Sequence, residues 1–142
     1  MFNKIGLIAT PGVEAVKTTL KELLSYLHAH KLHIILDKNC AKLVNIDNCE
    51  IFDASELGNQ CDLVIAIGGD GTMLRASHAL CDFNVPLLGI NLGHVGFLAD
   101  IPADNISKHL DDIMNGNYVE DIRFLLNGQV LRNDKCIYED YA

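Results

Sequence analysis

The feature that most constrains this chain is a short apolar run that ends in a cluster of glycines. The run covers residues 62–67, and the sequence Gly-Gly-Asp-Gly follows directly at residues 68–71. A β-branched apolar run, then glycines, then residues 72–76 predict a strand, a tight turn and a helix. Glycines place no Cβ between a ligand and the backbone, and a helix N-terminus offers unpaired N–H groups. The segment therefore predicts a phosphate-binding turn, in which Asp70 needs a chemical role because its carboxylate would repel a phosphate.

Strand and helix patterns alternate on either side of this turn. A first strand is predicted at residues 4–9, a helix from Val13 to Lys31, and a second strand at residues 33–37. Such a β-α-β opening favours a parallel sheet with right-handed crossovers. Further strands are predicted at residues 49–52, 63–67 and 85–91, and further helices at residues 71–81 and 104–115. We therefore expect an α/β fold, with a mostly parallel Rossmann-like sheet and flanking helices.

The pattern changes after Gly116. Strands are predicted at residues 122–126, 129–131 and 135–141, with Asn127-Gly128 as a hairpin turn. A run of strands after an alternating region indicates a second, all-β unit, here with too few strands to be stable alone. We expect an α/β domain at residues 1–118, followed at residues 119–142 by the start of a truncated all-β domain.

Composition and charge exclude several functions. The 142-residue chain has a net charge of −8, from 11 Lys and Arg against 19 Asp and Glu, and lacks a basic block, which argues against a nucleic-acid surface. No apolar stretch approaches the roughly 18 residues of a membrane span, and residues 2–9 are too few for a secretion signal. The five cysteines form no C-x-x-C pair, and we assign no metal ligand. We expect a cytoplasmic protein that binds neither nucleic acid nor membrane.

Two motifs together resemble those of the NAD kinases. Residues 68–76 have the sequence Gly-Gly-Asp-Gly-Thr-Met-Leu-Arg-Ala, and residues 91–100, one strand later, have Asn-Leu-Gly-His-Val-Gly-Phe-Leu-Ala-Asp. Residues 123–126, Arg-Phe-Leu-Leu, are also similar, and the resemblance extends along the chain from Ile5. It implies an enzyme that phosphorylates the 2′-hydroxyl of the adenosine ribose of NAD to give NADP. The implied phosphoryl donor is ATP or polyphosphate, together with Mg²⁺ or another divalent ion.

The resemblance gives Asp70 the role of proton acceptor and Gly71 that of an NAD-contacting glycine. The chemistry of the reaction supports the first role, because a secondary hydroxyl is a poor nucleophile that a carboxylate can orient and deprotonate. A helix N-terminus favours the ionised form of Asp70, which keeps it available as an acceptor. Ligation of Mg²⁺ is the alternative role for this carboxylate.

The remaining site residues have two interpretations each. Gly68 and Gly69 either form the phosphate turn or are only a tight turn, and Arg75 either contacts a phosphate or is a solvated helix residue. Phe97 either stacks near the adenine, as the resemblance implies, or packs in the core. Structural roles are expected for a further set: His78, His94, Asn91, Asp100 and the solvated pair Asp111-Asp112.

Other functions stay open as alternatives. Lipid kinases of the diacylglycerol and sphingosine type share Gly-Gly-Asp-Gly-Thr but continue with an Asn-Glu pair, whereas this chain continues Met73-Leu74. The 6-phosphofructokinases share only the first motif, and a non-catalytic nucleotide-binding module is a third possibility. The resemblance further implies that an Asn-Glu or Asn-Asp pair beyond Ala142 completes the NAD site. We accordingly expect little kinase activity from this chain alone and a homo-oligomeric parent protein.

Overall fold

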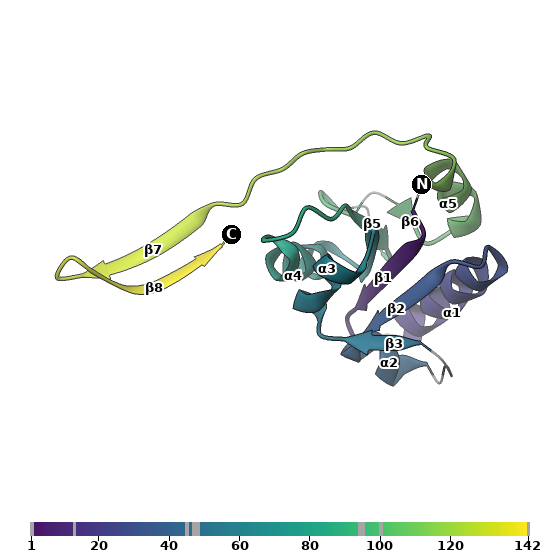
Figure 1. The fold of residues 1–142 in the computed structure, drawn as a ribbon, viewed down its shortest axis with the longest axis horizontal. Coiled ribbons are helices and arrows are strands. Elements are labelled where there is room, and N and C mark those ends of the chain that lie inside the picture. The colour runs from purple at the N-terminus through teal and green to yellow at the C-terminus, as the bar shows by residue number, and fades with distance from the viewer. Residues whose placement is uncertain are drawn as a thin grey trace.

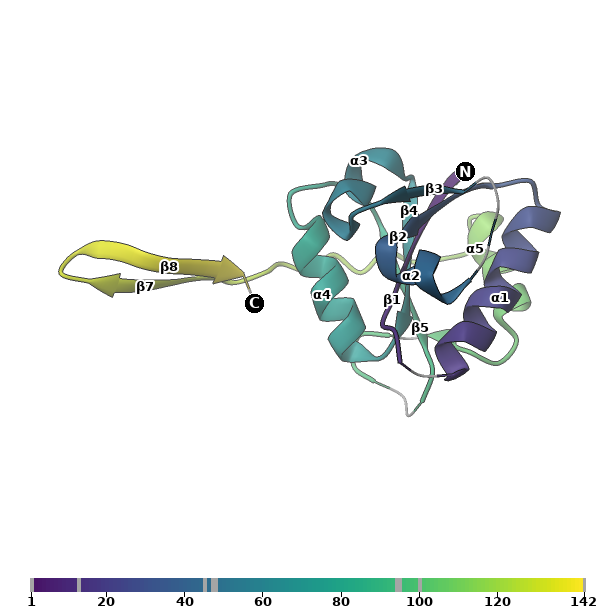
Figure 2. The same ribbon diagram turned by 90° about the horizontal axis from the view of Figure 1, so that it is seen from below.

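The computed structural model of this chain describes residues 2–12, 14–44, 46, 49–93, 96–99 and 101–141. A parallel sheet with helices on both faces forms one part, and a two-stranded antiparallel hairpin extends away from it (Figures 1 and 2). In chain order the elements are β1 (Lys4–Ala9), α1 (Glu14–Ala29), β2 (His33–Asp37), α2 (Lys38–Leu43), β3 (Glu50–Phe52), the 3₁₀ turn η1 (Ala54–Glu56), α3 (Leu57–Gln60), β4 (Leu63–Gly68), α4 (Asp70–Leu80), β5 (Leu87–Asn91), β6 (Ile101–Pro102), α5 (Ile106–Met114), β7 (Asn127–Arg132) and β8 (Lys135–Tyr141).

The order of the strands gives the sheet a topological switch point at its centre, outside which open sheets of this kind have their ligand crevice. The six strands lie in the order β3-β2-β1-β4-β5-β6, and all neighbouring pairs are parallel. The order reverses between β1 and β4, which pair directly, with Leu7 opposite Ile65. In open parallel sheets of this Rossmann order, ligands bind outside the carboxyl ends of the strands at this switch point. The expected α/β fold is confirmed, and the switch point lies where β4 runs into the glycine turn.

Each face of the sheet has its own hydrophobic layer. Ile5, Leu7 and Ile65 face α1 and α5, whereas Ile8 and Val64 face α3 and α4. Figure 2 shows α1 and α5 on one side of the sheet and α3 and α4 on the other. Because parallel strands are buried on both faces, their sequences are continuous apolar runs without alternation. This explains why the strands at residues 4–9, 33–37 and 63–67 were predictable to within one residue.

The helix α2 was not predicted. It begins directly after β2, because the buried side chain of Asp37 caps it and accepts a hydrogen bond of 2.6 Å from the backbone N–H of Cys40. The last residue of the strand thus also starts the helix. Sequence analysis also missed η1, α3 and the two-residue strand β6. The expected helix from Val13 begins at Glu14 among the described residues, and Val13 itself lies outside them.

The C-terminal segment differs from the prediction. No strand forms at residues 122–126, and Asn127 and Gly128 lie inside β7 instead of forming a turn. The turn lies at Asn133 and Asp134, whose φ angles of 52° and 59° are those that a type I′ hairpin requires at both central positions. The predicted turn at residues 127–128 was therefore wrong. Within the described residues, no helix is long and apolar enough to span a membrane.

Candidate functional site

The glycine turn lies at the switch point of the sheet. Gly68 is the last residue of β4, Gly69 precedes α4, and Asp70 and Gly71 are its first two residues. No side chain caps α4 at Gly69. The first N–H groups of a helix have no partner within the helix, so this end of α4 presents donors and a positive partial charge to the crevice. The arrangement has the geometry of an anion-binding turn.

The glycines of the turn differ in what surrounds them. A Cβ on Gly68 would lie 2.2 Å from Oγ1 of Thr72, so Gly68 is required for packing against α4. Among the described residues, a Cβ on Gly69 or Gly71 would have no atom within 4 Å, apart from its chain neighbours and, for Gly71, the backbone of α4. These two positions therefore border open space, in which a ligand can approach the backbone without meeting a side chain.

The carboxylate of Asp70 joins the two sequence motifs. Its Oδ2 accepts a hydrogen bond of 2.9 Å from the N–H of Phe97, and its Oδ1 accepts bonds of 3.0 and 3.4 Å from Leu98 and Ala99. These amide bonds hold the pKa of Asp70 below its ordinary value of 3.8. A Cβ on Gly96 would lie 2.2 Å from Oδ1, so only glycine permits this approach. Asp70 is thus an ionised group that is held in place by backbone donors.

A second group of polar side chains lies across the switch point. Thr10 follows β1, and its Oγ1 lies 2.7 Å from Oγ1 of Thr72 on α4. The guanidinium of Arg75 donates a hydrogen bond to the same hydroxyl of Thr10. Sequence analysis singled out Arg75 but not Thr10, for which the only signal was its place between a strand and the Pro11-Gly12 turn. Arg75 is exposed and contacts Thr10, so the structure is compatible with both of its interpretations.

The second motif ends in an exposed aromatic side chain. Phe97 is 91% exposed, so the interpretation as a core residue is wrong. Asn91 ends β5 as a buried residue, and its Oδ1 accepts a hydrogen bond of 3.0 Å from the N–H of Gly93. This contact fits the expected structural role of Asn91. His94 and Asp100 lie outside the described residues.

Two of the residues that were expected to be structural have partners that sequence analysis did not predict. Nε2 of His78, on α4, lies 2.5 Å from a carboxylate oxygen of Asp140 on β8. Asp111 and Asp112 are exposed, as expected for a solvated helix face, and Asp111 also accepts a hydrogen bond of 2.7 Å from the hydroxyl of Tyr26. Burial and this hydrogen bond raise the pKa of Tyr26 far above its ordinary value. Both contacts join segments that are distant in the sequence.

The part of the chain that the structure describes offers no protein cage for a metal. Within it, no group of three or more His, Cys, Asp or Glu side chains could hold an ion. Mg²⁺ is commonly bound through one or two carboxylates, several waters and the phosphates of a substrate. Asp70 is the carboxylate of the glycine turn, so these residues fit a divalent ion that arrives with a phosphate ligand.

A parallel sheet of this strand order, with a glycine turn at its switch point, places the chain in the class of open, doubly wound α/β proteins. Residues 5–118 match the family described as the ATP-NAD kinase N-terminal domain. The chain belongs to the NAD kinase family. The lipid kinase and phosphofructokinase alternatives find no support in this match.

Comparison with known proteins gives the same family. The chain is 38% identical over 141 residues to an NAD kinase of Coxiella burnetii, which covers 99% of this chain and 47% of the relative. It is 42% identical over 136 residues to an NAD kinase of Hahella chejuensis, covering 96% of this chain and 46% of the relative. Among solved structures it is similar to yeast NADH kinase complexed with NADH, with a TM-score of 0.82 and 20% identity over 99% of this chain and 46% of that one. The chain thus spans about half the length of the curated relatives that it matches.

Proposed function

We propose that this chain forms the α/β part of an enzyme that phosphorylates the 2′-hydroxyl of the adenosine ribose of NAD. One observation carries the proposal: the ionised carboxylate of Asp70 lies at the switch point, between the open glycine turn and the second motif. The names of the relatives support the substrate, because they are NAD kinases, and the yeast structure is that of an NADH kinase with NADH bound.

In this proposal Asp70 accepts the proton of the ribose hydroxyl. A carboxylate has about four lone-pair positions. The amides of residues 97–99 use two on Oδ1 and one on Oδ2, so Oδ2 has one position left for a hydroxyl. With a lowered pKa, Asp70 is a weak base that orients the hydroxyl and takes its proton as the phosphoryl group is transferred. Such a role suits a reaction that depends mainly on positioning and on neutralisation of charge.

The phosphates of the substrates are assigned to the same end of the crevice. The backbone at Gly69 and Gly71 faces open space at the positive end of α4. Arg75, on the second turn of α4, would add a cation near Thr10, and the exposed ring of Phe97 is available to stack on the adenine. We propose ATP or polyphosphate as the phosphoryl donor. A divalent ion such as Mg²⁺, held by the donor's phosphates with Asp70 as the nearby carboxylate, would neutralise phosphate charge.

We also propose that the α/β domain ends near residue 118 and that residues 119–142 begin a second domain. The matched range of residues 5–118 supports this boundary. So does the exposure of Val119, Ile122 and Phe124, whose side chains are 86–95% accessible and require a cover that the sheet does not provide. In the whole protein we place the remaining NAD contacts and the homo-oligomer contacts outside the α/β domain, and we expect the protein in the cytoplasm.

The proposal is tested with the full-length protein. Purified enzyme is incubated with NAD, Mg²⁺ and either ATP or polyphosphate, and NADP is measured with an NADP-specific dehydrogenase. We expect NADP formation with at least one donor, and little or none from residues 1–142 alone. Transfer of phosphate to diacylglycerol would contradict the proposal. Binding of NAD without turnover under any donor would instead indicate a non-catalytic module.

A further inference from the structure

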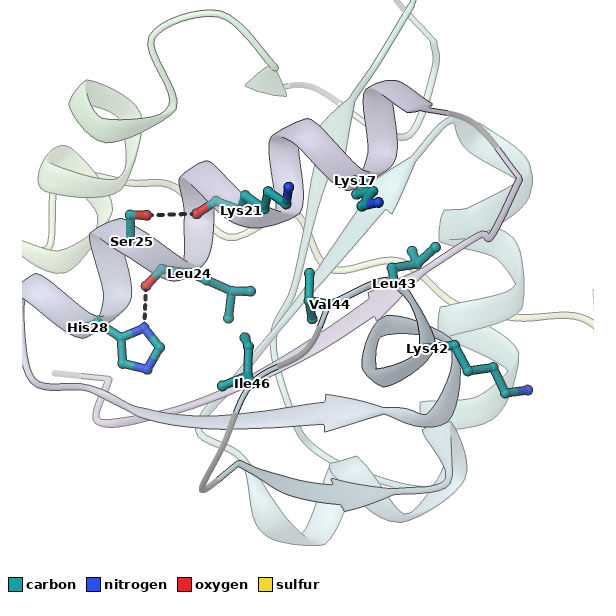
Figure 3. Close-up of a pocket in the computed structure, with 9 residues that line it drawn as sticks. All are labelled: Lys17, Lys21, Leu24, Ser25, His28, Lys42, Leu43, Val44 and Ile46. Carbon is teal, nitrogen blue, oxygen red and sulfur yellow. Dashed lines mark hydrogen bonds between the residues drawn. The ribbon is translucent and has the colours of Figure 1, made fainter.

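A hollow lies away from the glycine turn, between α1 and the segment that follows α2. Its volume is about 700 Å³, and it shares no lining residue with the candidate site described above. Figure 3 shows its two kinds of lining. Leu24, Leu43, Val44 and Ile46 provide apolar side chains, and polar side chains surround them: Lys17, Lys21, Ser25, His28 and Lys42. We call this hollow the lysine cavity.

The charge of the lysine cavity is opposite to that of the chain. The chain has a net charge of −8, yet three of its eight lysines line this one cavity, and none of the lining residues among those that the structure describes is acidic. Lys17 and Lys21 are four residues apart on α1, a spacing at which like charges destabilise a helix. Among the described residues, neither lysine takes part in an ion pair. A bound anion would neutralise the positive charge of this pair and relieve the repulsion between the two ammonium groups.

The floor of the cavity indicates what else the ligand contains. Leu24 and Val44 are buried core residues whose side chains point into the space between α1 and residues 43–46, and half-buried Ile46 lies beside them (Figure 3). The side chains of Ser25 and His28 are bonded to carbonyl oxygens of α1 itself, at 2.9 and 2.8 Å. A carbonyl oxygen can only accept a hydrogen bond, so Nδ1 of the His28 ring carries the proton and is the donor. These bonds hold both residues at the rim beside an apolar surface.

We propose that the lysine cavity binds a small phosphomonoester that carries an apolar group. The phosphate would lie between the ammonium groups of Lys17 and Lys21, and the apolar group would cover Leu24, Val44 and Ile46. A dianion compensates two ammonium groups, and the volume falls within the roughly 300–1,000 Å³ of small-molecule sites. The side chain of Lys42 extends away from the other two lysines in Figure 3, so it adds to the local potential without contacting the phosphate.

The experiment is an NMR titration of the ¹⁵N-labelled chain with hexyl phosphate at constant ionic strength. Inorganic phosphate and hexanol are the control ligands, since each has only one of the two required parts. We expect saturable shifts of the amides of α1 and of residues 42–44, and at least tenfold weaker binding of either control ligand. Shifts confined to residues 68–75 and 96–99, or equal binding of inorganic phosphate or hexanol, would overturn the proposal.

A pair of double variants tests the role of the two lysines. Lys17→Gln/Lys21→Gln removes the charges and also their repulsion within α1, so the helix is not weakened. Lys108→Gln/Lys135→Gln makes the same change of charge at two exposed positions outside the cavity. We expect at least tenfold weaker binding of hexyl phosphate for the first pair and less than a twofold change for the second, with melting temperatures recorded for both. Equal weakening by the two pairs would show a general charge effect and overturn the site.

Discussion

Replacement of Gly71 by alanine should make the chain more stable and its site less active. Gly71 is the second residue of α4, its φ is not positive, and a Cβ there would have no atom within 4 Å among the described residues outside its own helix. Glycine in a helix costs roughly 0.5–1 kcal/mol relative to alanine, because it loses more backbone entropy on folding. Gly71→Ala should therefore raise the free energy of unfolding by that amount. For a chain of this size the melting temperature should rise by about 1–4 °C.

The same methyl group should lower activity, because it projects into the open space that we assign to the ligand. A misplacement of about 1 Å at a reacting centre can cost about 100-fold in rate. Thermal unfolding followed by circular dichroism gives the stability, and NADP formation by the full-length variant gives the activity. A rise in melting temperature with activity reduced tenfold or more is the expected result. Full activity, or a loss of stability, would refute this interpretation of the open space.

Gly68→Ala is the matched comparison within the same turn. Its Cβ would lie 2.2 Å from Oγ1 and 2.8 Å from Cβ of Thr72, a buried residue that Thr10 also contacts. Overpacking of this kind typically costs about 1–3 kcal/mol. We therefore expect Gly68→Ala to lower the melting temperature, in contrast to Gly71→Ala. If both variants shift stability in the same direction, the distinction between a packing glycine and a ligand-facing glycine does not hold.

Three further predictions concern the contacts of Asp70 in the site and the cap of α2. The lowered pKa of Asp70 means that its amide bonds stabilise the fold above pH 3.8 and are lost as the pH falls through the lowered pKa. The NMR shifts of amides 97–98 should titrate with a midpoint below pH 3.8, and a midpoint above that value would contradict the contact. Gly96→Ala should separate Asp70 from these amides, seen as a change in the same NMR shifts and a pKa of Asp70 closer to its ordinary value; unchanged shifts would argue against the clash. Asp37→Ala removes the cap bond to Cys40 and should cost about 1 kcal/mol in denaturant unfolding, mostly restored in Asp37→Asn; no change would mean that the cap is not needed.

Much of the α/β fold could be predicted because its strands are buried on both faces. Continuous apolar runs identify β1, β2 and β4, and the helical spacing of apolar residues identifies α1. The helix α2 was missed because its start signal, Asp37, is also the last residue of an apolar strand. Local patterns assign one state to a residue, whereas Asp37 has a role in both elements.

The hairpin shows a different limit. Asn127-Gly128 has a strong turn composition, yet the turn forms at Asn133-Asp134, where both residues adopt left-handed conformations. The observed register places Val130 opposite Tyr138, and it gives every residue of β7 a partner in β8, with an irregularity between Val130 and Leu131. Turn composition alone does not show which of the two dipeptides forms the turn. The position of the turn also depends on how many strand residues can pair on either side of it.

The candidate site was located by its motifs, but its contacts were not. Asp70 and the glycines were predicted at the end of a strand, and that is where they lie. The amides that hold Asp70 come from a segment 27–29 positions later in the sequence, and Thr10 is 62 positions away from its partner Thr72. Such contacts follow from the order of strands in the sheet, which the sequence pattern does not specify.

The most direct test of the central claim compares binding and turnover in Asp70→Asn. The full-length wild-type enzyme and the variant are titrated with NAD by calorimetry, and their rates of NADP formation are measured at saturating NAD and donor. Asparagine keeps the size of the side chain and one acceptor oxygen, but it cannot take a proton from the ribose hydroxyl. We expect NAD affinity to change by less than about fivefold while turnover falls by at least about 100-fold, the lower range for general-base catalysis. Turnover near the wild-type rate would contradict the assignment of Asp70 as the group that accepts the proton.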